Sequence, residues 1–171
     1  ANGLLSRKAE LSTFLQIEDV DIALISETHL TSRLKSDIQG YNFYPCNHPS
    51  GSSHCGSAVY IKKNLQHHEY QAYCTPKIQA AVITIRLHNG FEAQVAAIYC
   101  PPRHGISSAE YTEFFNTLGN RWLVGGDLNA KHSLWGSRIT NKKEKNLYDV
   151  INTENLHCHS NGRPTYWPTD P

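Results

Sequence analysis

One stretch of the sequence is the most informative about the fold and about a possible ligand site: Trp122-Leu123-Val124-Gly125-Gly126-Asp127-Leu128-Asn129-Ala130-Lys131-His132. Apolar residues are followed by two glycines and a carboxylate, a pattern that predicts a buried strand ending in a turn. In layered α/β proteins, ligands collect at strand ends, where side chains stand on rigid supports. Residues two apart on an extended segment project to the same side, so Asp127 and Asn129 are expected to point at one place.

Asp127 and Asn129 allow two interpretations. The carboxylate can accept a proton from, or orient, an attacking water, and the amide can donate a hydrogen bond to a phosphate oxygen. The alternative is a tight turn in which both side chains bond to their own backbone. For an arbitrary Gly-Asp-x-Asn sequence the turn is favoured, so the local pattern leaves both interpretations open.

Two more polar residues stand just past apolar strands. Glu27 follows residues 22–26, and Tyr99 ends residues 93–99 and precedes Cys100-Pro101-Pro102. Glu27 can be an oxygen ligand to Mg²⁺ or an acid at the N-terminus of a helix. Tyr99 can hold a phosphate through its hydroxyl, or it can be a strand residue with its ring in the core. For each residue alone, the structural role is the commoner one.

Hydrophobic patterning predicts strands and helices in mixed order. The strands are expected at residues 22–25, 58–61, 78–87, 93–99 and 122–124, and the helices at 6–17, from Ser107 or Ser108 to Gly119, and at 142–155. The unbroken apolar run 22–25 is typical of a strand buried on both faces. In the first helix, Leu11, Phe14 and Leu15 are expected to face the core. This order indicates an α/β or α+β layered fold.

Composition and charge exclude several classes of protein. The 171 residues carry 16 Lys plus Arg and 15 Asp plus Glu, a net charge of +1, which excludes a histone-like basic arm or a polyanionic tail. No apolar run approaches the roughly 18 residues that cross a bilayer, so no membrane partner is expected. Five cysteines without a Cys-x-x-Cys pair argue against a secreted disulfide framework and predict an intracellular protein. We expect one domain over residues 1–171.

One loop gathers cysteine and histidine. Residues 47–57 are rich in serine, glycine and proline, and Cys46, His48, His54 and Cys55 lie in or beside them. A zinc site would use such residues, but no paired Cys-x-x-Cys and no second half of a finger spacing is present. Zinc is therefore the less favoured interpretation of this loop.

Six segments occur in a fixed order along the chain: Ala1-Asn2-Gly3-Leu4, Ile25-Ser26-Glu27-Thr28, Ser57-Ala58-Val59-Tyr60-Ile61, Tyr99-Cys100-Pro101-Pro102, Gly126-Asp127-Leu128-Asn129-Ala130-Lys131-His132-Ser133-Leu134-Trp135-Gly136 and Arg163-Pro164-Thr165. Together they resemble the endonuclease domain of non-LTR (LINE-type) retrotransposons, most of all the Jockey-like elements. That domain belongs to a superfamily of apurinic/apyrimidinic endonucleases, deoxyribonuclease-I-like nucleases and inositol-phosphate phosphatases. The resemblance covers nearly the whole chain.

The resemblance implies a four-layer β-sandwich of two mixed sheets flanked by helices, with a phosphodiesterase site at one end. By carry-over, Glu27 would ligate Mg²⁺, or Mn²⁺ in its place, and Asp127 would orient or deprotonate the water. Asn129 and Tyr99 would hold and polarise the scissile phosphate. The implied enzyme nicks double-stranded DNA in the nucleus and leaves a 3′-hydroxyl. That end primes the reverse transcriptase domain of the same polyprotein.

The resemblance also implies residues that this sequence lacks. The family's first-strand Asn would precede Ala1, and its closing Ser-Asp-His would follow Pro171. We therefore expect a domain truncated at both ends and weak or inactive by itself, because loss of one preorganised donor costs on the order of 10²-fold in rate. Two alternatives are a phosphodiesterase or phosphatase of the same superfamily acting on another phosphoester, and an inactive nucleic-acid-binding remnant.

Basic residues provide candidate contacts with DNA. Arg138, Lys142, Lys143 and Lys145 form a local cluster, and Thr165 belongs to the last segment of the resemblance. Lys62 and Lys63 form a second basic pair. A solvated surface explains such clusters about as often as nucleic-acid binding does.

Overall fold

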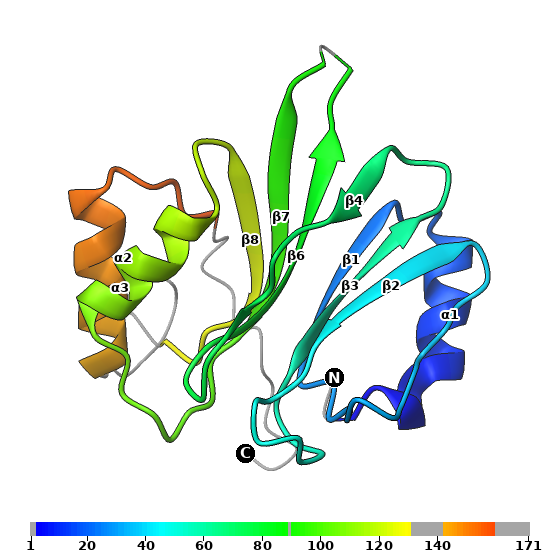
Figure 1. The fold of residues 1–171 in the computed structure, drawn as a ribbon, viewed down its shortest axis with the longest axis horizontal. Coiled ribbons are helices and arrows are strands. Elements are labelled where there is room, and N and C mark those ends of the chain that lie inside the picture. The colour runs from blue at the N-terminus through cyan, green and yellow to red at the C-terminus, as the bar shows by residue number, and fades with distance from the viewer. Residues whose placement is uncertain (1–2, 89, 131–141, 160–171) are drawn as a thin grey trace, which may run out of the picture.

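The computed structural model describes residues 3–88, 90–130 and 142–159. Two β-sheets pack face to face, with α1 on the outer face of the first sheet and α2 and α3 on the outer face of the second (Figure 1). The α+β sandwich with four layers that the resemblance implies is confirmed. None of the helices in these residues is long and apolar enough to span a bilayer.

The first sheet has three strands in the order β1-β3-β2: β1 (Ile22–Ser26), β2 (Tyr41–Cys46) and β3 (Ser57–Lys62). Both neighbours run antiparallel to β3. Ser57 lies opposite Ser26 on one side and opposite Cys46 on the other, so these three residues mark one end of the sheet.

The second sheet is mixed. It contains β4 (His67–Glu69), β5 (Tyr73–Cys74), β6 (Gln79–Arg86), β7 (Glu92–Tyr99) and β8 (Trp122–Asp127). The order is β4-β6-β7-β8, with β5 also paired to β6. β7 and β8 are parallel, because α2 (Ser108–Thr117) carries the chain back between them, and the other pairs are antiparallel. Tyr99 and Asp127 therefore end neighbouring strands at the same edge of the sheet.

Buried apolar side chains fill the spaces between the layers. Val59 and Ile61 of β3 meet Ile83 of β6 and Val95 of β7 between the two sheets. On the outer face of the second sheet, α2 buries the four residues expected from its sequence, Tyr111, Phe114, Phe115 and Leu118. This packing fixes both sheets as a rigid support for the loops at their ends.

The start and the inward face of α1 (Lys8–Ile17) differ from the sequence prediction. Ser6 lies in a 3₁₀ turn (Leu5–Arg7) and donates to the Gly3 carbonyl, so it does not cap the helix. Leu15 is buried and Leu11 packs against the same core, but Phe14 is 55% exposed. Residues four apart lie on the same face of a helix, so Leu11 and Leu15 face the core together, whereas Phe14 lies beside that face and points toward solvent.

β1 is not buried on both faces as its apolar run predicted. All five residues, Ile22–Ser26, are half-buried. The strand lies at the end of the three-stranded order, so it has a hydrogen-bonded neighbour on one side in the described part of the chain. An uninterrupted apolar run indicates contact with two layers, but it does not distinguish a central strand from a terminal one.

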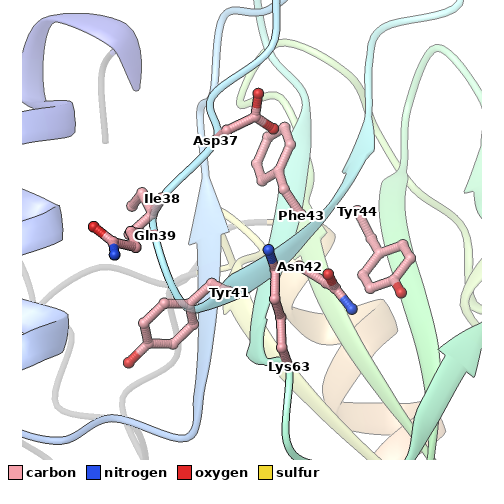
Figure 2. Close-up of a pocket in the computed structure, with 8 residues that line it drawn as sticks. All are labelled: Asp37, Ile38, Gln39, Tyr41, Asn42, Phe43, Tyr44 and Lys63. Atoms are coloured by element: carbon pink, nitrogen blue, oxygen red, sulfur yellow. The ribbon is translucent and has the colours of Figure 1, made fainter.

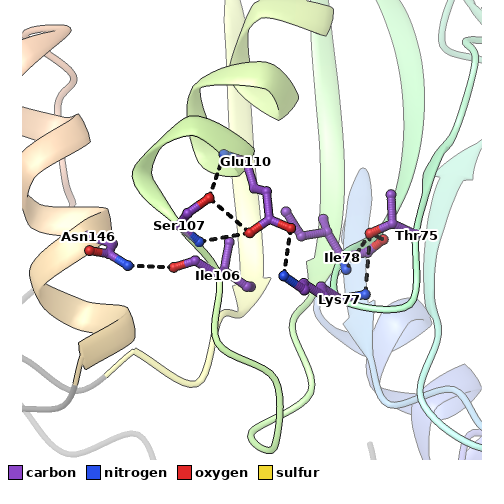
Figure 3. A network of polar contacts seen from close by, with 7 residues as sticks. All are labelled: Thr75, Lys77, Ile78, Ile106, Ser107, Glu110 and Asn146. Atoms are coloured by element: carbon purple, nitrogen blue, oxygen red, sulfur yellow. Dashed lines mark hydrogen bonds and ion pairs between the residues drawn. The ribbon is translucent and has the colours of Figure 1, made fainter.

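The other two helices follow their sequence signals. Ser107 and Glu110 form a capping box at the start of α2, as Figure 3 shows. Lys77 pairs with Glu110 at 2.8 Å, and Asn146 Nδ2 of α3 (Lys142–Thr153) donates to the Ile106 carbonyl at 2.7 Å. These contacts anchor the segment between β7 and α2.

Candidate active site

Three strands from the two sheets end at the same place, the lower end of the sandwich in Figure 1. Glu27 directly follows β1, Tyr99 is the last residue of β7, and Asp127 is the last residue of β8. Tyr99 lies opposite Asp127 in the parallel pair, and its hydroxyl donates to Glu27 Oε1 at 3.0 Å. The structure therefore brings together three residues that the sequence separates by up to 100 positions.

The Tyr99 hydroxyl is held in its protonated form. Burial raises its pKa well above the ordinary value of about 10, and the hydrogen bond to Glu27 and the charges of Glu27 and Asp127 raise it further. The ring is 4% exposed, so the prediction of a ring in the core holds, but the hydroxyl is bound to a carboxylate. A phenol that stays protonated at neutral pH can act as a hydrogen-bond donor.

Glu27 does not stand at the start of a helix, so that structural alternative is wrong. Residues 27–30 are irregular, with Glu27 at φ 58° in the left-handed region. Such a conformation costs a non-glycine residue on the order of 1 kcal/mol or more. Backbone bonds hold it in place: Gly3 donates to the Glu27 carbonyl at 3.0 Å, and Thr28 donates to the Gly56 carbonyl at 3.2 Å. The carboxylate is thus aimed by tertiary contacts.

Asp127 and Asn129 form the turn that the sequence left as an alternative. The Asn129 backbone N–H donates to Asp127 Oδ1 at 2.9 Å, and Asn129 Nδ2 donates to the Cys100 carbonyl at 3.1 Å. β8 ends at Asp127 and Asn129 has φ 48°, so the expectation that both side chains project from one extended segment is wrong. Asp127 remains exposed, so the turn fixes its carboxylate without covering it.

Ser26 connects the two sheets immediately beneath the site. Its hydroxyl donates to the Ile98 carbonyl at 2.9 Å and accepts from the Asp127 N–H at 3.0 Å. Ser57, opposite Ser26 in the first sheet, forms a second bridge: it donates to the Gln79 carbonyl and accepts from the Ala81 N–H, each at 3.0 Å. Sequence patterns did not indicate that these serines bridge the sheets, although a hydroxyl at either end of an apolar strand is a detectable signal.

Replacing Ser26 by alanine is expected to lower the free energy of unfolding by about 1–3 kcal/mol. The change removes two hydrogen bonds and leaves the Ile98 carbonyl and the Asp127 N–H without this partner. Chemical denaturation measures the loss. Thr13→Ala is the control, because the exposed Thr13 hydroxyl bonds to the Ala9 carbonyl within α1. Equal losses in the two variants would contradict a bridging role for Ser26.

The donor atoms at the site fit a hard divalent cation. Glu27 and Asp127 supply carboxylate oxygens, and Mg²⁺ is usually bound by one or two carboxylates together with water and phosphate. Among the described residues, no group of three or more His, Cys, Asp or Glu side chains is arranged to hold a metal ion. Cys46, His48, His54 and Cys55 therefore gain no support as a zinc site.

A hollow of about 460 Å³ lies along β2, at the end of the first sheet that faces away from Glu27 (Figure 2). It is lined by Asp37, Ile38, Gln39, Tyr41, Asn42, Phe43, Tyr44 and Lys63. Lys62 lies at the same end and pairs with Asp19 and Asp21 at 2.7 and 2.8 Å. Its position and pairing argue against the phosphate contact suggested for Lys62.

Four of the predicted nucleic-acid contacts are not placed by the structure. Arg138 and Thr165 lie outside the described residues, and Lys142 and Lys143 begin α3 with side chains that are also outside them. His132 and Trp135 of the motif that follows β8 are likewise outside the described part.

Comparison with known proteins identifies relatives in two ways. Residues 93–171 match the family model described as endonuclease-reverse transcriptase. The chain is 35% identical over 171 residues to an RNA-directed DNA polymerase from the mobile element jockey of Drosophila melanogaster, and 32% identical over 169 residues to the corresponding protein of Drosophila funebris. These alignments cover 100% and 99% of this chain but 19% and 18% of the relatives, so the chain spans under a fifth of their length.

Solved structures show the same fold. The endonuclease domain of TRAS1, a telomere-specific non-LTR retrotransposon, superposes with a TM-score of 0.74 at 23% identity, over 93% of this chain and 70% of that one. An AP endonuclease from Leishmania major superposes with a TM-score of 0.63 at 12% identity, over 89% and 62% of the two chains. The chain is therefore similar over its whole length to part of the jockey RNA-directed DNA polymerases, its residues 93–171 match the endonuclease-reverse transcriptase family model, and it has the fold of the TRAS1 endonuclease domain.

Proposed function

We propose that this domain is a divalent-metal-dependent endonuclease that nicks double-stranded DNA at the site formed by Glu27, Tyr99, Asp127 and Asn129. The observation that carries the proposal is the hydrogen bond from Tyr99 to Glu27 beside Asp127, because it joins the ends of strands from both sheets around two carboxylates. Carboxylates with a protonated phenol suit the hydrolysis of a phosphodiester, which needs charge neutralisation and an oriented water.

Each residue has a separate task in this proposal. Asp127 orients or deprotonates the attacking water, and its exposed position leaves room for substrate. Tyr99, kept protonated, donates a hydrogen bond to the phosphate or keeps Glu27 in place. Glu27 would hold Mg²⁺, which would supply Lewis acidity and neutralise charge on the phosphate. Asn129 fixes the loop through Cys100 and offers its amide to the phosphate when DNA is bound.

The relatives of this chain suggest what the nicked DNA is used for and where the reaction takes place. The relatives of this chain are RNA-directed DNA polymerases, so the nicked 3′-hydroxyl would prime reverse transcription by the same polyprotein. That reaction would take place on chromosomal DNA, in the nucleus. The expectation that residues 1–171 are weak or inactive alone is tested by assaying the chain by itself and within its polyprotein.

Removal of divalent metal is expected to abolish nicking. Supercoiled plasmid is incubated with the polyprotein form in Mg²⁺, Mn²⁺ or EDTA, and conversion to the relaxed circle is followed on a gel. Extension of the nick by a DNA polymerase with labelled nucleotides reports a free 3′-hydroxyl. Nicking that persists in EDTA would contradict the metal requirement. Release of phosphate from small phosphoesters without any nicking would favour the phosphatase alternative.

A further inference from the structure

Two loops leave the sheets at the same end of the sandwich as the candidate site. Residues 47–56 join β2 to β3, and residues 100–107 join β7 to α2. The first loop is docked onto the segment that carries Glu27: His29 N–H donates to the Cys55 carbonyl at 2.9 Å, and Ser53 Oγ donates to the His29 carbonyl at 2.6 Å. The second loop begins at the residue after Tyr99. Both loops therefore have fixed positions beside the candidate catalytic residues.

Both loops carry imidazole rings, and the two rings of the first loop are in contact. The rings of His48 and His54 lie with centroids 4.3 Å apart. His48 Nδ1 accepts from the Ser50 N–H at 3.2 Å and lies 2.8 Å from Ser50 Oγ, and the ring also bonds to the backbone of Pro76. Burial lowers the pKa of His48, and so do the charges of His54 and of His104 in the second loop. His48 is thus a neutral ring held by Ser50, and the ring of His54 packs against it.

The exposed part of this surface carries no carboxylate of its own. His54, Arg103 and His104 are exposed, and neither residues 47–56 nor residues 100–107 contain Asp or Glu. Glu110, just beyond the second loop, is held by Lys77 and by the cap of α2 (Figure 3). Lys77 and the Ser107 N–H lower the pKa of Glu110. The carboxylates that face these loops are thus Glu27 and Asp127 of the candidate site, which the proposed metal would offset.

We propose that His54, His104 and Arg103 form a docking surface for one strand of the DNA beside the phosphodiester to be cut. Flat imidazole rings stack on bases, and the guanidinium group donates to phosphate oxygens. The anchored His48 holds the ring of His54 in one orientation, which reduces the entropy lost on binding. The inference rests on the proposed function, because it assigns the substrate strand of that same site.

The test compares DNA binding and nicking by matched histidine variants. The double variant His54→Ala/His104→Ala is expected to bind a short fluorescein-labelled duplex at least about fivefold more weakly, the low end for loss of a stacking ring. Its KM for plasmid nicking should rise by a similar factor with kcat unchanged. His88→Ala is the control, because exposed His88 lies in the β6–β7 connection at the other end of the sandwich. Binding is measured in EDTA by fluorescence anisotropy.

Two further readouts distinguish docking from a structural effect. His54→Phe should retain most of the affinity that His54→Ala loses, because it keeps a flat ring. Binding to heparin, which has phosphate-like charge but no bases, should depend on Arg103 and not on the two histidines. Unchanged DNA binding by the double variant, or an equal loss with His88→Ala, would overturn the inference. Failure of the wild-type protein to nick any DNA would instead defeat the proposed function.

Discussion

Replacing Asp127 by asparagine is expected to reduce plasmid nicking by about 10² to 10⁴-fold, the range for loss of a general base. Asparagine keeps an oxygen that can accept the Asn129 N–H, so the turn after β8 should survive. The substitution therefore removes the negative charge and the proton acceptor while retaining the local geometry. The initial rate of relaxed-circle formation at saturating metal measures the effect.

The matched control for this variant is Asp21→Asn. Asp21 is also an exposed carboxylate, but it pairs with Lys62 at the opposite end of the first sheet from Glu27. Nicking by Asp21→Asn should equal that of the wild-type protein. A folded Asp127→Asn variant that nicks at the wild-type rate would exclude Asp127 from the chemistry, and the assignment of the site would then be wrong.

Replacing Gly126 by alanine is expected to be the most destabilising single substitution in β8. A Cβ atom at this position would overlap the Ile98 carbonyl oxygen of β7, and the residue has φ 151°. Overpacking typically costs about 1–3 kcal/mol, and an unfavourable backbone conformation costs about 1–3 kcal/mol more. We expect a loss of at least about 2 kcal/mol in the free energy of unfolding. Thermal denaturation should show a midpoint several degrees lower.

Gly125→Ala provides the comparison within the same strand. Its Cβ would lie 2.7 Å from Leu24 Cδ1, the far end of a flexible side chain that can move. The loss of stability should therefore be clearly smaller than for Gly126→Ala. A comparable loss in both variants would show that general strand disruption, and not the contact with the Ile98 carbonyl, determines the effect.

Local patterns were sufficient for the elements with strong periodicity or capping. α2 begins at the predicted serine and buries the predicted aromatic residues, because its capping box and helical spacing agree. β6 and β7 were predicted from their β-branched residues. β2 was missed, since Pro45 and Asn42 interrupt its apolar pattern, and β4 was missed because it consists of His67, His68 and Glu69. Both strands depend on pairing with β3 or β6.

In the candidate site, too, some features could be predicted from local sequence and others depend on tertiary contacts. Glu27, Tyr99 and Asp127 were identified because each ends an apolar run, a feature visible in one dimension. The bond between Tyr99 and Glu27 joins residues 72 positions apart, and the bridge of Ser26 to Asp127 spans 101 positions. No local pattern encodes such contacts, because they depend on how the two sheets pack.

By itself, the sequence indicated the family through its ordered motifs, and it determined most of the elements and the identity of the polar residues at the strand ends, which follow from residue types and spacing. Only the tertiary structure decided which of those residues meet, that Asp127 and Asn129 form a turn, and that the rings of His48 and His54 are in contact. The physical reason is that sheet packing and loop docking bring distant segments together, whereas sequence patterns report only the contacts that each segment makes along its own axis.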